Sequence, residues 1–124
     1  MSLESALFDL LKPLVPTNVN GTRRVYPTIA PAGVLPPYIT FQQVGGEAPT
    51  FVDNAVPSKR NARMQINVWS TTQVDANAIA LAIEAALVVA TTLQARPEGA
   101  FVATDDEVTN LFGARQDFSI WSDR

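Results

Sequence analysis

Two segments of the chain alternate between apolar and polar residues with the period of a β-strand. One runs from Asn61 to Ser70 and the other from Ala114 to Ser122, and the two repeat a common order of residue types that starts with Ala-Arg and ends with Trp-Ser. Side chains two positions apart share a face of a strand. The apolar positions on the expected core faces are Met64, Ile66, Val68, Phe118 and Ile120. We therefore expect both segments to be strands with one face turned to the core.

The opposite faces of the same strands are polar, yet each carries a tryptophan. They contain Arg63 and Trp69 in the first segment, and Arg115 and Trp121 in the second. Tryptophan is uncommon on a face that meets only water. If the strands were antiparallel neighbours in matching register, Arg63 would lie near Trp121 and Arg115 near Trp69, and each cation–π pair would contribute about 0.5–1 kcal/mol. We treat these four residues as candidate contact residues.

Two other segments have the spacing of helices. Apolar residues recur at helical intervals from Leu3 to Leu14, with Ser2 placed to cap the first turn. A second helix is expected to begin after an N-cap at Thr71 or Thr72, with Asp75 in the capping-box position if Thr72 is the cap, and to run to about Leu93. Its apolar residues spread most of the way round, so it is expected to be buried on more than one side. Either the first helix covers it or a second subunit does.

The remaining segments predict shorter strands and one long loop. Tyr38 to Val44 is expected as a strand and Arg24 to Tyr26 as a short one, while Ala100 to Thr104 has a weaker strand pattern. Phe112 is expected as a core anchor, and Gly113 as a bend into the last strand.

The loop from Gly45 to Lys59 is much longer than the roughly 2–5 residues that a hairpin needs. Its apolar residues, Phe51 among them, favour a segment that packs on something. Two readings stay open: an arm on a neighbouring chain, or a flap on its own sheet. Phe51 is the fifth candidate contact residue.

These elements predict an α+β fold in a single domain spanning residues 1–124. The expected sheet is mostly antiparallel, with about four strands and two helices packed on one face. The expected order is helix-strand-strand-helix-strand-strand.

The residues that most catalytic sites need are missing from the sequence. It contains neither Cys nor His, and it has no glycine-rich phosphate loop and no Gly-x-Ser-x-Gly elbow. Asp105, Asp106 and Glu107 are adjacent, so their side chains point to different sides, which favours an acidic hairpin loop over a cation site. We expect no enzyme, no cofactor and no bound metal.

Charge and hydropathy limit the partners further. The formal net charge is −3 and the pI is about 4.7, which argues against a surface that grips nucleic acid. The most apolar stretch, residues 78–93, is interrupted by Glu84 and is shorter than the roughly 20 residues of a membrane span. The N-terminus lacks the basic start of a signal peptide. We expect a cytoplasmic protein without a membrane partner.

Four sequence blocks, in order along the chain, resemble a known family. They are Arg24-Val-Tyr-Pro27, Leu35-Pro-Pro-Tyr-Ile-Thr-Phe-Gln-Gln43, Met64-Gln-Ile-Asn-Val-Trp69 and Gln116-Asp-Phe-Ser-Ile-Trp121. Together they look like the signature blocks of the tail-completion, or tail-terminator, proteins of long-tailed bacteriophages and prophages. The chain departs from that pattern at Asn67, where an acidic residue is common, and in its alanine-rich second helix.

The resemblance implies an α+β subunit that forms a ring, typically hexameric, at the head-proximal end of the phage tail. The ring would end tail-tube growth and join the tail to the head connector. Its partners would be further copies of the chain, the tail-tube protein and a head-completion protein, with viral DNA passing through the lumen without sequence-specific binding. The protein would be assembled in the host cytoplasm and end at the head–tail junction of the virion.

A different class of function stays open beside this one. The chain is alternatively a cytoplasmic α+β binding module that uses the Trp-bearing sheet face for a peptide or small ligand. The size of the assembly distinguishes the two.

Overall fold

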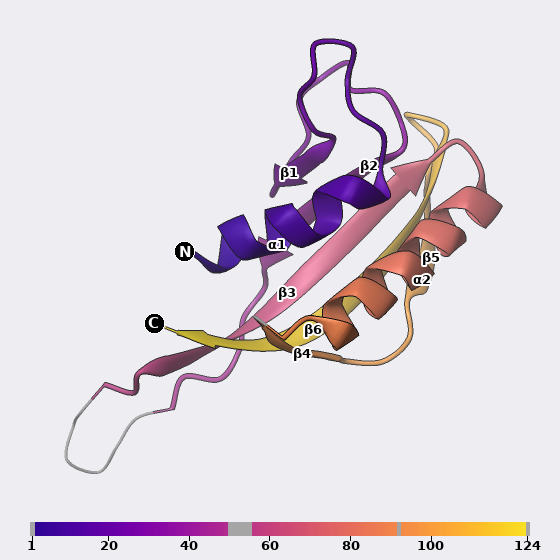
Figure 1. The fold of residues 1–124 in the computed structure, drawn as a ribbon. Coiled ribbons are helices and arrows are strands. Elements are labelled where there is room, and N and C mark those ends of the chain that lie inside the picture. Colours follow the sequence, from indigo (N-terminus) through magenta and orange to yellow (C-terminus); the bar gives the residue numbers. More distant parts are fainter. Residues whose placement is uncertain (1, 50–55, 92, 124) are drawn as a thin grey trace.

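The computed structural model describes residues 2–49, 56–91 and 93–123, and within them two α-helices cover one face of a six-stranded mixed sheet (Figure 1). The elements follow the chain as α1 (Leu3–Leu11), the short 3-10 helix η1 (Lys12–Leu14), β1 (Val25–Pro27), β2 (Tyr38–Gln43), β3 (Lys59–Ser70), α2 (Gln73–Val89), β4 (Gln94–Pro97), β5 (Val102–Asp106) and β6 (Leu111–Asp123). The expected α+β class and the placement of both helices on one face are confirmed.

Both expected helix caps are present. The Ser2 hydroxyl accepts a hydrogen bond from the Ser5 amide at 3.1 Å, and the Thr72 hydroxyl accepts one from the Asp75 amide at 3.2 Å. These side chains satisfy amides that the first helical turn leaves without a partner. The sequence pattern therefore located the start of each helix correctly.

Both helices end earlier than expected. The α-helical part of α1 stops at Leu11 and a 3-10 turn follows, because Pro13 has no amide hydrogen to continue the helix. α2 stops at Val89, since Ala90 is extended. Leu93 is then buried, and the chain enters β4.

The sheet is mostly antiparallel, as expected, but it has more strands than expected and contains a parallel pair. Its order is β1-β2-β3-β6-β4, and β5 pairs with β6 as well. β1 runs parallel to β2, and β4 is an additional antiparallel partner of β6. The sequence suggests a turn at Arg96 to Gly99, but the β6 edge offers backbone partners that hold Gln94–Pro97 as a strand. The expected sheet of about four strands is thus corrected to six within the described residues.

The two segments that resemble each other are the central neighbours of the sheet. β3 and β6 pair antiparallel, from Lys59 opposite Asp123 to Ser70 opposite Phe112. The buried apolar residues of this pair are Ala62, Met64, Ile66, Val68, Ala114, Phe118 and Ile120. They meet Leu3, Leu7 and Leu11 of α1 and Ile83 and Leu87 of α2 in one apolar core. The predicted core faces of both strands are confirmed.

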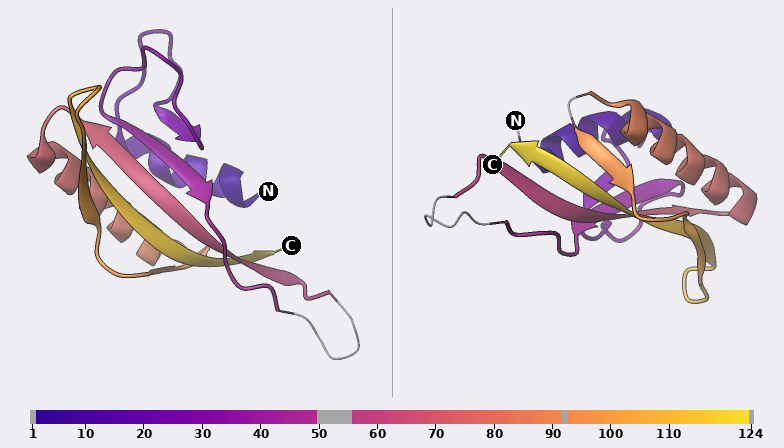
Figure 2. Two further views of the ribbon diagram at one scale, coloured as in Figure 1. Left: turned by 180° about the vertical axis from the view of Figure 1, so that it is seen from behind. Right: turned by 90° about the horizontal axis from the view of Figure 1, so that it is seen from below.

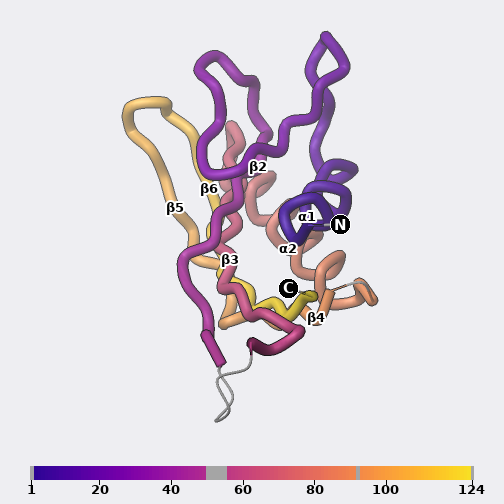
Figure 3. Tube along the Cα trace, turned by 90° about the vertical axis from the view of Figure 1, so that its left-hand side faces the viewer, coloured from indigo at the N-terminus to yellow at the C-terminus, as the bar shows by residue number. Residues whose placement is uncertain are grey.

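The side of the sheet away from the helices is left open. The turn end of the β5–β6 hairpin curves away from the helices, so that it stands beside this open face (Figure 2, Figure 3). At the opposite end, residues 44–45 extend the β2–β3 pairing: the Val44 amide donates to the Arg63 carbonyl, and the Arg63 amide donates to the Gly45 carbonyl, both at 2.8 Å. Phe51 lies outside the described residues, so the choice between an arm and a flap stays a prediction.

Candidate functional site: the open face of the sheet

The open face carries the odd-numbered residues of β3 and β6. Arg63, Trp69, Arg115 and Trp121 all lie on it, because each alternates with the buried residues of its strand. Register separates them into two groups. Trp69 and Arg115 lie at one end of the face, and Arg63 and Trp121 lie at the other, about 20 Å away by the rise of a strand.

The expected arginine–tryptophan pairs are diagonal neighbours and are not in cation–π contact. Arg63 is opposite Ser119, two positions along β6 from Trp121, and its Nε donates to Asp117 Oδ2 at 2.9 Å. Among the described residues the cation–π contact is Lys12 Nζ over the Phe8 ring, at 5.7 Å. Asp117 offers Arg63 a full negative charge, which attracts a guanidinium more strongly than the face of a ring.

At the end of the face that carries Trp69 and Arg115, the Trp69 ring lies on the backbone of Gly113. A Cβ atom at Gly113 would be 2.8 Å from Trp69 Cε3 and 2.7 Å from Thr104 Oγ1. Only glycine leaves enough space for this contact. Tyr38 is opposite Trp69 on β2, so the two aromatic side chains are cross-strand neighbours here. Gly113 therefore makes room for the Trp69 ring. It lies within the last strand and not ahead of it, because β6 already begins at Leu111.

Asp106, at the end of β5, influences the Tyr38 hydroxyl. Burial raises the pKa of Tyr38 above its usual value of about 10, and the negative charge of Asp106 raises this pKa further. The folded protein therefore holds the phenolic proton more tightly than the unfolded chain does. Tyr38 contributes stability that is fully present below about pH 10 and is lost as the pH rises through the higher folded-state pKa.

Replacing Asp106 with asparagine is expected to lower the pKa of Tyr38, because it removes a negative charge and keeps the oxygen that accepts the Val108 amide. An ultraviolet absorbance titration of the phenolates measures this pKa, and Tyr38→Phe assigns the transition. Asp105→Asn is the matched control, since Asp105 is the next residue along β5 and points to the other face. An unchanged Tyr38 titration in Asp106→Asn would contradict the placement of the hairpin beside the open face.

At the end of the face that carries Arg63 and Trp121 there is a groove with a volume of about 630 Å³. It is lined by Gly46, Glu47, Asn61, Arg63, Arg96, Pro97, Glu98, Ser119 and Trp121. Asn61 organises it: its oxygen accepts the Glu47 amide at 2.8 Å, and its nitrogen donates to Ser119 Oγ at 2.9 Å. Gly46 approaches so closely that a Cβ would lie 2.7 Å from the Asn61 carbonyl oxygen.

The charges of the groove are mixed. Arg63 is paired with Asp117, and Glu47 and Glu98 add negative charge beside Arg96. Two further cations at the start of β3 are also paired with carboxylates, since Lys59 Nζ is 2.6 Å from Asp123 and Arg60 is 4.0 Å from Glu4. This end of the face therefore suits a polar, zwitterionic protein surface better than a polyanion.

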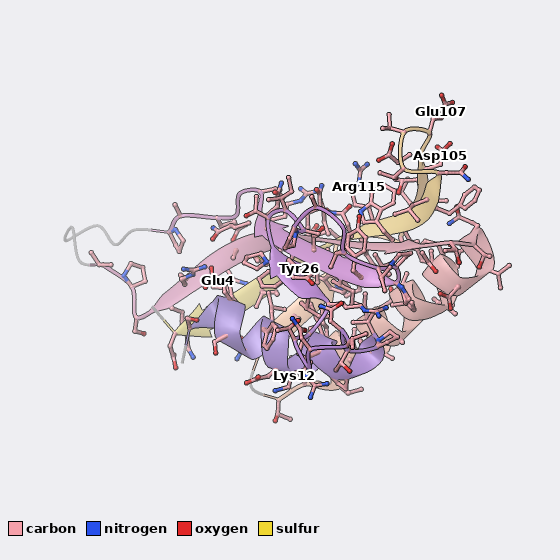
Figure 4. All side chains as sticks on the ribbon, turned by 90° about the horizontal axis from the view of Figure 1, so that it is seen from above. Glu4, Lys12, Tyr26, Asp105, Glu107 and Arg115 are labelled. Carbon is pink, nitrogen blue, oxygen red and sulfur yellow. The ribbon has the colours of Figure 1, made fainter. Side chains whose placement is uncertain are left out.

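Arg115 differs from Arg63 in having no charged partner. Its side chain is exposed and makes no hydrogen bond or ion pair with any other residue that the structure describes. Figure 4 shows Arg115 on the sheet beside the hairpin, with Asp105 and Glu107 at the hairpin's end. The expected acidic hairpin loop is confirmed, with Asp105 and Asp106 closing β5 and Glu107 in the turn.

Sequence reasoning missed several residues of this face. It did not single out Asn61, Arg96 or Glu47, because these come together only when the loop after β2 and strand β4 reach opposite sides of β3 and β6. The sequence did contain one sign of this contact, the Gly45-Gly46 pair, because adjacent glycines often mark a place where the backbone approaches another segment closely.

The described residues contain no group of three or more His, Cys, Asp or Glu side chains placed to hold a metal ion. They also contain no helix that is long and apolar enough to cross a membrane.

The chain matches a known protein family in sequence and a solved virion structure in fold. Residues 5–123 match the family described as Tail completion protein gp17. No curated protein matches the sequence significantly. A chain from the structure titled "Virion of native gene transfer agent (GTA) particle" has a similar fold, with a TM-score of 0.62 and 19% sequence identity over 99% of this chain and 96% of that one.

Proposed function

Since the chain belongs to the Tail completion protein gp17 family and is thus a structural protein of the phage virion tail, we propose that it forms a ring at the head-proximal end of the tail. The ring, a hexamer by the family resemblance, ends the growth of the tail tube and joins the tail to the head connector. Its partners are further copies of the chain, the tail-tube protein and a head-completion or connector protein.

The observation that carries this proposal is the extent of the family match. Residues 5–123 include all six strands of the sheet, so the match rests on the whole fold and not on one motif. The similar chain in the gene transfer agent virion supports the proposal, because that protein is part of a virion and shares this fold over nearly its full length.

The surface charges agree with a ring through which DNA passes. The chain carries a net charge of −3, and Arg63 on the open face is neutralised by the Asp117 carboxylate. A lumen that binds DNA tightly would slow its passage, and an acidic protein binds it weakly. We propose that viral DNA passes through the lumen without sequence-specific contacts.

Deleting the gene from the phage or prophage that carries it tests the proposed role. Electron microscopy of the lysate is expected to show DNA-filled heads without tails, and free tails whose tubes vary in length beyond the normal value. The wild-type gene on a plasmid is expected to restore joined particles with tails of uniform length. Joined particles with normal tails in the deletion lysate would contradict the proposal.

The groove favours a second candidate function, that of a peptide-binding module. Its lining combines Trp121 with two arginines and two glutamates, which suits a short polar segment of another protein. On this alternative the chain is a monomer or dimer, and Trp121→Ala abolishes peptide binding without changing assembly. On the ring proposal the same groove faces a partner in the tail.

A further inference from the structure

The outer surface of α2 is apolar although nothing in the described part of the chain covers it. Its exposed positions include Val74, Leu81, Val88 and Val89, which are exposed by 52–81%, together with Ala78 and Ala85. We call these six residues the α2 outer face. The inner positions of the helix, Ala76, Ala80, Ile83 and Leu87, are buried in the core. A helix that is apolar on both sides is typical of one that is buried on both sides.

The spacing and the charges show that this outer face is continuous. Val74, Ala78, Leu81, Ala85 and Val88 follow each other at intervals of four and three residues, so they form one stripe along the helix. From Ala76 to Ala95 the sequence has a single charged residue, Glu84. Glu84 points inward, where its Oε1 accepts a hydrogen bond from Gln116 Nε2 at 2.7 Å. The stripe is therefore free of charge along most of its length.

A second charge-free surface lies on the loop between β1 and β2. The sequence has no charged residue from Val25 to Gly46. Within this stretch, Ile29 and Leu35 are exposed by 79% and 55%. We call residues 28–37 the β1–β2 loop surface.

Hydrogen bonds hold this loop in place. The Arg24 guanidinium donates from Nη1 to the Pro36 carbonyl at 3.2 Å, and the Thr28 amide donates to the Phe41 carbonyl at 2.8 Å. Proline occupies several of its positions and restricts its backbone further. The loop is thus a preformed apolar surface, which loses little conformational entropy when it is covered.

The two surfaces lie on opposite sides of the subunit. The loop adjoins β1, the strand at one end of the sheet order, whereas α2 packs on β6, β3 and β4 towards the other end. Figure 1 shows the loop above and α2 at the lower right, with α1 and the strands between them. One copy therefore cannot bring its own two surfaces together, but two copies can.

A contact between two different surfaces on opposite sides of a subunit is heterologous. Repeated from copy to copy it closes into a ring or continues as a filament, whereas α2 packed on α2 would stop at a dimer. The open sheet face is a poor alternative partner for α2. Arg63, Asp117 and Arg115 would lose water there without gaining polar partners from an aliphatic stripe.

We propose that the α2 outer face of one copy packs on the β1–β2 loop surface of the next copy around the ring. This inference rests on the ring proposed above and names the surfaces that build it. Leu81 lies at the centre of one side of the contact, and Ile29 and Leu35 lie on the other.

One aspartate on either surface tests the contact. Leu81→Asp and Leu35→Asp are both expected to fold with the circular dichroism spectrum of the wild type, because both positions are more than half exposed. Each alone is expected to raise the concentration needed for ring assembly about 100-fold or more, because every interface would bury one unpaired charge. Val108→Asp also replaces an apolar residue with aspartate, but at a nearly fully exposed turn residue; it is the control and is expected to keep the ring.

An equimolar mixture of the two variants identifies which surfaces meet. It contains one kind of intact contact, between α2 of the Leu35→Asp copy and the loop of the Leu81→Asp copy. The mixture is expected to form dimers that hold one copy of each variant, measured by light scattering with one variant carrying a mass tag. Dimers in Leu35→Asp alone would show α2–α2 pairing and overturn the proposal.

Cross-linking gives a second readout, because the natural chain has no cysteine. A chain with both Ile29→Cys and Leu81→Cys, treated with a short thiol-reactive cross-linker, is expected to give a ladder of linked copies that ends at the copy number of the ring. Chains with either cysteine alone are expected to give no ladder.

The outcomes separate this inference from the proposed function. Rings that persist in both aspartate variants, or a double-cysteine ring without a ladder, would place the interface elsewhere and leave the ring intact. A wild-type chain that forms no ring, alone or on assembled tail tubes, would contradict the ring and this interface together.

Discussion

Phe118→Ala is expected to lower the free energy of unfolding by about 3–5 kcal/mol, the largest effect we expect from a single core truncation. Phe118 is fully buried, with 0% of its surface exposed. It is opposite Met64 on β3 and Pro97 on β4, so it touches both neighbours of β6 beneath the helices. Truncation removes these contacts, and the paired strands on both sides hinder the core from closing the cavity.

Urea unfolding followed by circular dichroism measures this change. Phe112→Ala is the matched control, because it is the same substitution in the same strand at a residue that is 38% exposed. It is expected to cost less than about 1 kcal/mol. The expected core role of Phe112 is wrong, since it lies where β6 leaves the body of the sheet and joins the hairpin. Equal losses in the two variants would contradict the position of the core.

Gly113→Val is expected to cost about 2–3 kcal/mol and to shift the fluorescence of Trp69 towards that of an exposed tryptophan. The new Cβ would lie 2.7 Å from Thr104 Oγ1, 2.8 Å from Trp69 Cε3 and 2.9 Å from the Val68 carbonyl oxygen. The first two atoms belong to side chains that can move. The Val68 oxygen belongs to the paired backbone of β3, so relief requires that β3 and β6 separate locally.

Urea unfolding and emission spectra in a Trp121→Phe background test this effect on Trp69 alone. Ala103→Val on β5 is the control, because Ala103 is exposed and pairs with Ala114, the neighbour of Gly113. It adds two methyl groups to a Cβ that is already present and is expected to change stability by less than about 0.5 kcal/mol. An unchanged Trp69 spectrum in Gly113→Val would show that the ring does not lie on Gly113.

The sequence predicted the central pair of strands because local alternation fixes which residues face the core. Met64, Ile66 and Val68 are buried as expected, as are Phe118 and Ile120. Gln116 belongs to the same face, yet no local pattern explains a buried amide. Its Nε2 donates to Glu84 Oε1 at 2.7 Å and to the Gly99 carbonyl at 2.8 Å, and these partners come from α2 and the β4–β5 connection.

The edges of the sheet were predicted least well. β1 and β4 are short, and they are strands because a neighbour offers backbone partners, not because of their own residues. A sequence pattern cannot show the parallel register of Val25 with Ile39. For α2 the sequence left two alternatives, burial under α1 or burial against a second subunit. The structure favours the second alternative, because α1 leaves the outer face of α2 exposed.

The sequence predicted which residues lie on the open face, but it did not predict which residues they contact. Alternation placed Arg63, Trp69, Arg115 and Trp121 on one face correctly. Their contacts depend on residues from distant strands and loops. Trp69 lies on Gly113, and Arg63 pairs with Asp117 more than fifty positions away. Phe51 stays a candidate without a described position, and the role of all five residues in contacts with partners stays a prediction.

The mass of the purified protein in solution tests the ring most directly. Light scattering across a concentration series, with negative-stain imaging of the largest species alone and on assembled tail tubes, measures both size and shape. We predict a closed ring with a central hole, formed in solution or on the end of the tube. A protein that stays monomeric at every concentration and does not bind the tube end as a ring would contradict the account.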